Sequence, residues 1–103
     1  AVTASDDAIT QAISWQADAL MVHHGYFWKG ESPIITGMKR QRIAKLLSQD
    51  INLFAYHLPL DCHLELGNNA CLAKLFKVQS VQKQKAGGTE DLLWSGVLSE
   101  PIS

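Results

Sequence analysis

The sequence predicts an α/β fold, a three-layer αβα arrangement built on βαβ crossover units around a mostly parallel sheet. Segments in which apolar residues recur at helical spacing alternate with short apolar runs of strand length, a pattern typical of parallel sheets covered by helices. The composition agrees, because 103 residues with 47% hydrophobic content and a formal net charge of -1 describe one ordinary globular domain. We expect residues 1–103 to form a single α/β domain that is an incomplete portion of a longer chain.

The first half of the chain predicts two helices, one strand and a long loop. Ser5 is a typical N-cap, and the apolar residues after it recur at helical spacing, so we expect a helix over about Asp6–Gln16. The apolar run Ala17–Val22 has the length of a buried strand. The segment Gly25–Gly37 mixes aromatic residues with Gly and Pro and follows neither period, which predicts an ordered loop. Met38–Gln49 is the second predicted helix, with its basic residues on a solvated face.

The second half begins with another short apolar run, Ile51–Tyr56, which predicts a second strand. Pro59 disfavours helical geometry at Leu58, so we expect His57–Asp61 to be a loop. A third helix follows and is predicted to be capped near Asn68. The remaining residues predict a weak strand at Val78–Val81, a turn at Gly87-Gly88 and a strand at Leu92–Leu98.

Four side chains of metal-ligating types follow the two predicted strands. His23 and His24 come directly after the first strand, and His57 and Asp61 come after the second. The carboxyl ends of parallel strands meet at one edge of a sheet, where open α/β sheets place their ligand sites. Imidazole and carboxylate together suit zinc, iron or manganese rather than calcium. The sequence therefore predicts a divalent-metal site at this edge.

The adjacent histidines restrict the geometry of that site. Neighbouring residues in a regular strand point to opposite faces, so His23 and His24 share a site only where the backbone leaves the strand, or else they face two neighbouring ions. A pair of ions about 3.5–4 Å apart suits the second arrangement. The alternative for each histidine is a hydrogen-bonded structural role, and Asp61 can equally cap a loop.

Three consecutive aromatic residues in the predicted loop form a second candidate site. Tyr26, Phe27 and Trp28 are followed by Lys29, and together they can stack on a planar substrate with an ammonium group near its phosphates. The alternative, which the residue pattern favours, is that the aromatic rings pin a long loop to the body of the protein. No phosphate-binding glycine motif occurs in the sequence, so nucleotide binding has no motif of its own.

Charge, hydropathy and cysteine usage exclude several classes of function. Nine basic against ten acidic side chains provide no strongly basic field, which disfavours nucleic acid as a partner. The longest apolar runs are far too short to cross a membrane, and the N-terminus lacks a signal-peptide pattern. Two cysteines without zinc-binding spacing favour a reducing compartment. We expect a cytoplasmic protein that does not bind membranes.

Three segments carry a resemblance to a known family. The stretch Val22-His23-His24-Gly25-Tyr26-Phe27-Trp28-Lys29-Gly30-Glu31-Ser32-Pro33, then His57-Leu58-Pro59-Leu60-Asp61, then Glu65-Leu66-Gly67-Asn68-Asn69, closely resembles the dinuclear metal-centre hexameric proteins. These form the NIF-three-like or YbgI-type family, whose members are often labelled homologues of type 2 GTP cyclohydrolase I. The likeness covers nearly the whole chain.

The resemblance implies a cytoplasmic α/β protein that assembles as a toroidal homohexamer with two divalent metal ions, zinc, iron or manganese, facing its cavity. By that likeness His23, His24 and Asp61 are metal ligands, and His57 lies beside the site as a ligand or as a residue that supports the ligands. In a hydrolase, His57 would be the catalytic residue that carries a proton or orients the water. One departure matters, because the family completes its site with a later His-x-x-x-Glu element that does not occur after Asp61 here.

Two classes of function remain open on these residues. The first is a metal-dependent hydrolase, similar to GTP cyclohydrolase type 2 by resemblance, with a nucleotide as substrate and Tyr26, Phe27 or Trp28 stacking on its base. The second is a non-enzymatic, ring-shaped metal-bearing scaffold that binds a partner protein or nucleic acid. Its contact surface would be the basic side chains of the second helix, namely Lys39, Arg40, Arg42 and Lys45. A chain that lacks half of the metal site is expected to bind metal more weakly than the intact protein.

Overall fold

The computed structural model describes residues 1–101, which fold as two compact units. The first unit comprises residues 1–56, and the second begins at His57. Helices and strands alternate along the first unit, whereas the second has two helices followed by two strands. The α/β class predicted from the sequence is therefore confirmed. The single-domain organisation of the chain stays a prediction.

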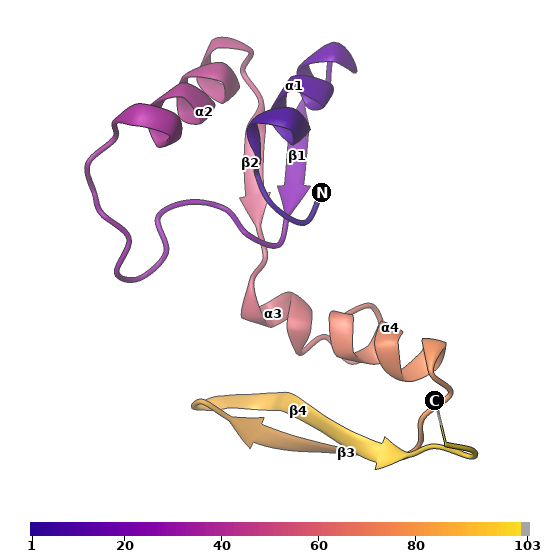
Figure 1. Ribbon diagram of the computed structural model, residues 1–103. Coiled ribbons are helices and arrows are strands. Elements are labelled where there is room, and N and C mark those ends of the chain that lie inside the picture. The colour runs from indigo at the N-terminus through magenta and orange to yellow at the C-terminus, as the bar shows by residue number, and fades with distance from the viewer. Residues whose placement is uncertain (102–103) are drawn as a thin grey trace. The chain divides into compact units, whose positions relative to one another are not determined.

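The first unit is a parallel βαβ crossover preceded by a helix. Its elements are α1 (Asp6–Ser14), β1 (Ala19–Val22), α2 (Gly37–Ser48) and β2 (Asn52–Ala55). Strands β1 and β2 run in the same direction (Figure 1), and their residues pair in register from Ala19 opposite Asn52 to Val22 opposite Ala55. All four elements lie where the sequence predicts them; α1, β1 and β2 are each two residues shorter than predicted, and α2 is shifted by one residue.

The first helix begins as the sequence predicts. Ser5 has extended backbone dihedrals, and its hydroxyl accepts a hydrogen bond of 3.2 Å from the amide of Ala8. Asp6 and Asp7 in the first turn complement the positive end of the helix. The segment before this helix runs parallel to the end of β1, where Thr3 forms a bridge with His24.

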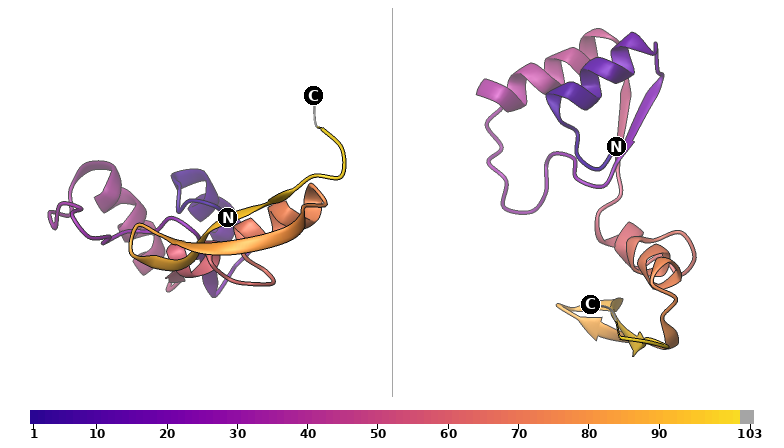
Figure 2. Two further views of the ribbon diagram at one scale, coloured as in Figure 1. Left: turned by 90° about the horizontal axis from the view of Figure 1, so that it is seen from below. Right: turned by 45° about the vertical axis from the view of Figure 1, so that its right-hand side comes forward.

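The core of the first unit lies on one face of the strand pair. Ile9 and Ala12 of α1 pack with Leu46 of α2, and Leu20 of β1 packs against them. Both helices therefore cover the same face, as Figure 2 shows. On the opposite face, the side chains of Met21 and Phe54 are 63% and 48% exposed. Because the helices of the first unit cover only one face of this pair, the three-layer arrangement stays a prediction.

The second unit contains α3 (Leu58–Asp61), α4 (Asn68–Leu75), β3 (Gln79–Ala86) and β4 (Thr89–Val97). The two strands form an antiparallel hairpin, so the mostly parallel sheet predicted for the chain does not include this pair, whereas the turn predicted at Gly87-Gly88 is confirmed. The turn explains the result, because Gly87 and Gly88 have φ values of 54° and 83°. Two such residues form a hairpin turn, whereas a parallel connection needs a dozen residues or more.

The segment His57–Asp61 is a short helix rather than the predicted loop. Leu58 and Pro59 occupy the first turn of α3, where the missing N–H of proline costs nothing. The amide of Cys62 donates to the carbonyl of Leu58 at 3.0 Å, which closes the turn. The prediction failed because it applied the restriction on the residue before proline without weighing proline's tolerance at a helix start.

The start of α4 also differs from the prediction. Its N-cap is Gly67, which has no side chain to cap the helix, and Asn68 is the first helical residue. A Cβ atom at Gly67 would overlap the carbonyl oxygens of Leu60 and His63, so only glycine fits this close approach. The next residue, Asn69, instead ties the helix to the hairpin by donating to the carbonyl of Leu92 at 2.8 Å.

Candidate metal centre

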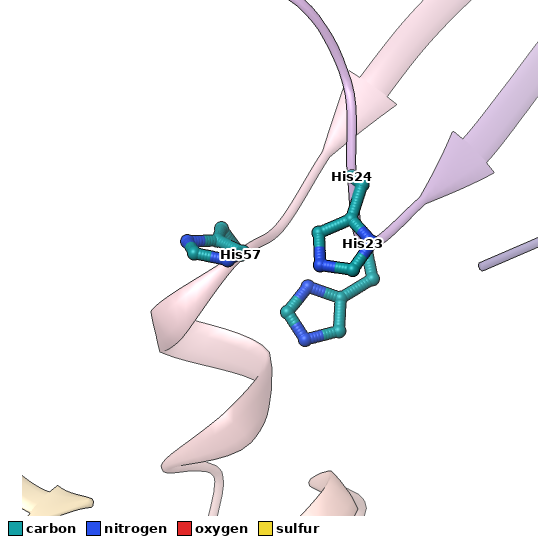
Figure 3. A group of neighbouring side chains, drawn as sticks. All are labelled: His23, His24 and His57. Atoms are coloured by element: carbon teal, nitrogen blue, oxygen red, sulfur yellow. The ribbon is translucent and has the colours of Figure 1, made fainter. Parts of the chain in front are cut away.

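Three histidines come together at the carboxyl ends of β1 and β2. His23, His24 and His57 each offer one ring nitrogen, and these three nitrogens all lie within 4.8 Å of one another. Figure 3 shows the three imidazoles where the chain leaves the two strands. His23 is partly buried, and His24 and His57 are exposed. The group therefore joins a protected side chain to two that solvent and ligands can reach.

The strand pair itself explains why His57 lies beside the other two. The amide of Tyr56 still donates to the carbonyl of Val22 at 3.0 Å, so the chain follows β1 up to the residue before His57. Val22 is in turn the residue before His23. Parallel pairing of two strands, one ending directly before His23 and the other two residues before His57, thus brings the histidines to one edge.

The backbone leaves the strand at His23 and His24, which allows the two adjacent histidines to share one site. Strand β1 ends at Val22, so neither histidine has to obey the alternation of a regular strand. Their rings are stacked, with centroids 4.6 Å apart and an angle of 25° between the planes. Adjacent residues therefore present their imidazoles side by side.

The donor set fits a divalent transition metal. Imidazole nitrogens bind zinc at about 2.0–2.1 Å, so two nitrogens on one ion are at most about 4.2 Å apart. The upper bound of 4.8 Å in this group exceeds that value by a few tenths of an ångström, which side-chain rotation can supply. Neutral imidazole is also the commonest protein ligand of such metals.

Asp61, the fourth predicted ligand, is not among the three grouped side chains. It is the last residue of α3 and is partly buried. Because α3 is helical, Asp61 follows His57 by one turn, and its amide is 3.4 Å from the carbonyl of His57. His57 itself is the N-cap of α3 and does not have helical dihedrals, so the helix alone does not place the two side chains on one face, and Asp61 stays a predicted ligand.

The aromatic residues of the loop have different environments. The Tyr26 hydroxyl donates to the carbonyl of the fully buried Ala4, and its ring packs against the core. Burial raises the pKa of this hydroxyl above its ordinary value of 10.0, while the guanidinium of Arg42 opposes the shift. Phe27 and Trp28 are 64% and 63% exposed. Tyr26 thus belongs to the framework, and the other two rings remain accessible.

The loop that carries these rings is anchored by an ion pair. Lys39 of α2 lies 3.1 Å from the carboxylate of Glu31, and both side chains are largely shielded from solvent. The same ammonium lies 4.5 Å from the centre of the Phe27 ring. The Glu31 carboxylate accepts a hydrogen bond from the amide of Phe27, whose φ of 62° is unusual for a side chain of this size. The loop is therefore ordered, as the sequence predicts.

The basic side chains of α2 are for the most part engaged within the first unit. Besides Lys39, Lys45 forms an ion pair of 2.6 Å with Asp6 of α1, and Arg42 lies beside Tyr26. Of these four basic residues, Arg40 is exposed, and the other three are partly exposed, so Arg40 is the most accessible to a partner. The expectation that these residues form one solvated basic face is wrong for Lys39 and Arg42, which are partly buried.

The sequence analysis missed one residue that touches the histidine group. The hydroxyl of Thr3 lies 3.3 Å from Nδ1 of His24. The two residues are 21 positions apart, and no spacing rule joins them, because the contact depends on the way residues 1–4 lie along β1.

A parallel βαβ unit whose strands end at a group of three histidines defines this chain as an α/β protein with a candidate metal centre. Comparison with known proteins identifies the family. The chain matches the Duf34/NIF3 (NGG1p interacting factor 3) family along residues 1–103, and it belongs to that family.

Its relatives include proteins called GTP cyclohydrolase 1 type 2 homologs. One from Haemophilus influenzae is 56% identical over 102 residues, which are 99% of this chain and 40% of the relative. One from Escherichia coli K12 is 52% identical over 101 residues, or 98% of this chain and 39% of the relative. The chain thus spans about two fifths of the length of the curated relatives that it matches.

Solved structures agree with this assignment. The structure described as protein ybgI, of unknown function, has a TM-score of 0.76 and 58% identity, and the match covers 81% of this chain and 33% of that chain. A Thermus thermophilus protein has a TM-score of 0.72 and 39% identity, with 80% and 34% covered. Among residues 1–101, no helix combines the length and the apolar character that crossing a membrane requires.

Proposed function

We propose that this chain supplies part of a divalent-metal site to a metal-dependent hydrolase. The observation that carries the proposal is the group of three imidazole nitrogens within 4.8 Å of one another. The names of relatives at 52–56% identity, homologs of GTP cyclohydrolase 1 type 2, support hydrolysis as the reaction class. A divalent ion at such a site supplies Lewis-acid chemistry, which makes water a better nucleophile at neutral pH and polarises the bond to be cleaved.

Four residues of this chain have roles in the proposed metal site. His23 and His24 hold metal through their stacked rings, and a pair of neighbouring ions suits two adjacent imidazoles 4.6 Å apart. Asp61 adds a carboxylate ligand one helical turn after His57. His57 is exposed enough to act either as a further ligand or as the group that carries a proton to or from substrate. We propose zinc, iron or manganese as the metal, because this donor set accepts each of them.

The site is proposed to be completed by residues that this chain does not contain. Relatives are about two and a half times as long as the stretch matched here, since the match covers 40% of the relative from Haemophilus influenzae. Three imidazoles and one carboxylate leave coordination positions open for two ions, which a later His-x-x-x-Glu element would fill. We propose a cytoplasmic homohexamer that faces these sites toward a central cavity, as the family resemblance implies.

Metal titration tests the proposal directly. The full-length protein, purified without chelator, is expected to contain about two transition-metal ions per chain by elemental mass spectrometry. A His23→Ala and Asp61→Ala double variant should lose them. The matched control is His63→Asn, because His63 lies outside the group and its Nδ1 accepts two loop amides, a role that an asparagine oxygen can take over. Metal-free but folded wild-type protein overturns the proposal and leaves a binding scaffold as the alternative.

The proposed substrate is a nucleotide, held by stacking on an exposed ring. Trp28 is the strongest candidate, because its ring is 63% exposed and no neighbouring cation covers it in the described residues. Phe27 already has the Lys39 ammonium over its ring, so it contributes less. Hydrolysis assays on purine and pyrimidine nucleotides should show a raised KM in Trp28→Ala. A wild type that hydrolyses none of them overturns the substrate class and leaves the metal site as it is.

A further inference from the structure

A threonine near the N-terminus has the contacts of a residue that orients one of the metal-binding histidines. The hydroxyl oxygen of Thr3 lies 3.3 Å from Nδ1 of His24. The two residues form a parallel β-bridge, so their side chains lie on the same face of the chain pair. We propose that Thr3 is a positioning residue that holds the His24 imidazole so that its Nε2 atom coordinates the metal, an inference that rests on the proposed metal site.

The backbone on both sides of Thr3 is fixed against the two histidines. The carbonyl of Val2 accepts the amides of His23 at 3.0 Å and His24 at 2.8 Å, and the amide of Ala4 donates to the carbonyl of His24 at 3.0 Å. Ala4 is fully buried. Four residues of main chain thus bracket the contact between the Thr3 and His24 side chains, which leaves the hydroxyl little freedom to move away.

The anchor continues into the body of the first unit. The carbonyl of Ala4 also accepts the hydroxyl of Tyr26, whose ring packs against the core. The branched side chain of Thr3 has few allowed χ1 rotamers, and in the observed one its hydroxyl lies beside Nδ1 of His24. The position of the His24 ring is therefore linked, through Thr3, Ala4 and Tyr26, to the buried core of this unit.

The chemistry of imidazole gives this contact its consequence. A neutral histidine that binds metal through one nitrogen carries its proton on the other, and that N–H needs an acceptor. With Thr3 beside Nδ1, the proton of a coordinated His24 lies on Nδ1 and is donated to the hydroxyl oxygen. Nε2 is then the coordinating atom. Losing such a hydrogen-bond partner typically lowers metal affinity by about 10–100-fold.

A threonine-to-valine change isolates the hydroxyl, because valine keeps the branched shape and the backbone preference. Zinc affinity of the full-length protein is measured by competition with a chromogenic chelator for wild type, Thr3→Val, Thr3→Ser and Thr10→Val. Thr10 is the matched control, since its hydroxyl donates within α1 to the carbonyl of Asp6. We expect Thr3→Val to bind about 10–100-fold more weakly, Thr3→Ser to stay near wild type, and Thr10→Val to equal it. Thermal unfolding of the metal-free proteins should not differ.

Nitrogen NMR of the histidine rings supplies a readout that a general loss of structure would not produce. In the zinc-loaded protein, His24 should be coordinated through Nε2 with its proton on Nδ1, and in the metal-free protein Thr3→Val should change the tautomer ratio of His24 alone. Equal zinc affinity of wild type and Thr3→Val, or coordination through Nδ1, overturns the inference about Thr3. If wild type does not bind zinc, the proposed function is overturned. If Thr3→Val leaves the tautomer ratio of His24 unchanged in the metal-free spectra, the contact between Thr3 and His24 is overturned, whatever the zinc affinity.

Discussion

Replacing Gly25 with alanine should damage both the strand pair and the histidine group. A Cβ atom at this position would lie 2.5 Å from the Cβ of Ala55 in β2. Apolar carbons in contact are normally about 3.5–4.0 Å apart, so the two atoms would have to separate by about 1 Å or more. Both are attached directly to the backbone, so no side-chain rotation relieves the overlap. Gly25 follows His24 directly, and Ala55 precedes His57 by two residues, so the separation opens the candidate metal site.

The expected loss of stability follows from two opposing effects. Overpacking of this kind costs about 1–3 kcal/mol. Alanine also restricts the unfolded chain, which returns about 0.4–1 kcal/mol where the backbone is unstrained, and Gly25 does not have a left-handed φ. We therefore expect Gly25→Ala to lower the free energy of unfolding by about 0.5–2 kcal/mol, measured by urea unfolding. Zinc affinity should fall with it.

A compensating change provides the control. Ala55→Gly removes the atom that the new Cβ meets, and by itself it should cost about 0.5–1 kcal/mol because glycine weakens a strand. The next neighbours of the new Cβ are both 3.9 Å away, which is ordinary contact. The double variant should therefore lie within about 0.5 kcal/mol of wild type, although both single variants are less stable. Losses that simply add in the double variant would refute the steric argument.

Three further predictions test other parts of the first unit. Ile9→Ala should lower the free energy of unfolding, measured in urea, by about 2–5 kcal/mol. Leu47 is 75% exposed, so Leu47→Ala should change that free energy by less than about 0.5 kcal/mol. Equal losses in the two variants would contradict the assigned core. Lys45→Met breaks the ion pair with Asp6 and should cost less than about 1 kcal/mol, a cost that shrinks as salt rises during thermal unfolding. Tyr26→Phe removes a hydrogen bond worth about 1 kcal/mol. Burial raises the pKa of the tyrosine above 10.0, so the stability that its protonated hydroxyl contributes is fully present below pH 10 and is lost as the pH rises through the folded pKa. The difference in unfolding free energy between wild type and Tyr26→Phe should therefore narrow in alkaline solution. It should not change near neutral pH.

The elements of the first unit could be predicted because local signals agreed with the fold. Ser5 caps the helix that its side chain predicts, and the short apolar runs become the paired strands β1 and β2. The second unit was less predictable at two points. Pro59 predicted a loop, but it lies in the first turn of a short helix. The turn at Gly87-Gly88 was predicted correctly, but the mostly parallel sheet predicted for the chain does not include the antiparallel strands on either side of that turn.

The candidate site was predictable as far as the strand ends determine it. Parallel pairing brings His23, His24 and His57 together, and that follows from their positions after two apolar runs. The contact of Thr3 with His24 could not be predicted, because it depends on three-dimensional pairing between segments 21 residues apart. Asp61 remains a predicted ligand, because it ends α3 and is not among the three grouped side chains.

The histidine group also couples metal binding to the folding of the first unit. His24 is tied to residues 2–4 by main-chain hydrogen bonds, and His57 follows Tyr56, whose amide still donates to the carbonyl of Val22 in β1. The group therefore requires three chain segments to be paired at once, and the unfolded chain does not hold them together. A ligand that binds only the folded form stabilises it in proportion to the logarithm of its concentration, by about 2.7 kcal/mol at one hundred times Kd. Metal should consequently protect the amides at the carboxyl ends of β1 and β2 from hydrogen exchange more than those of the hairpin β3–β4.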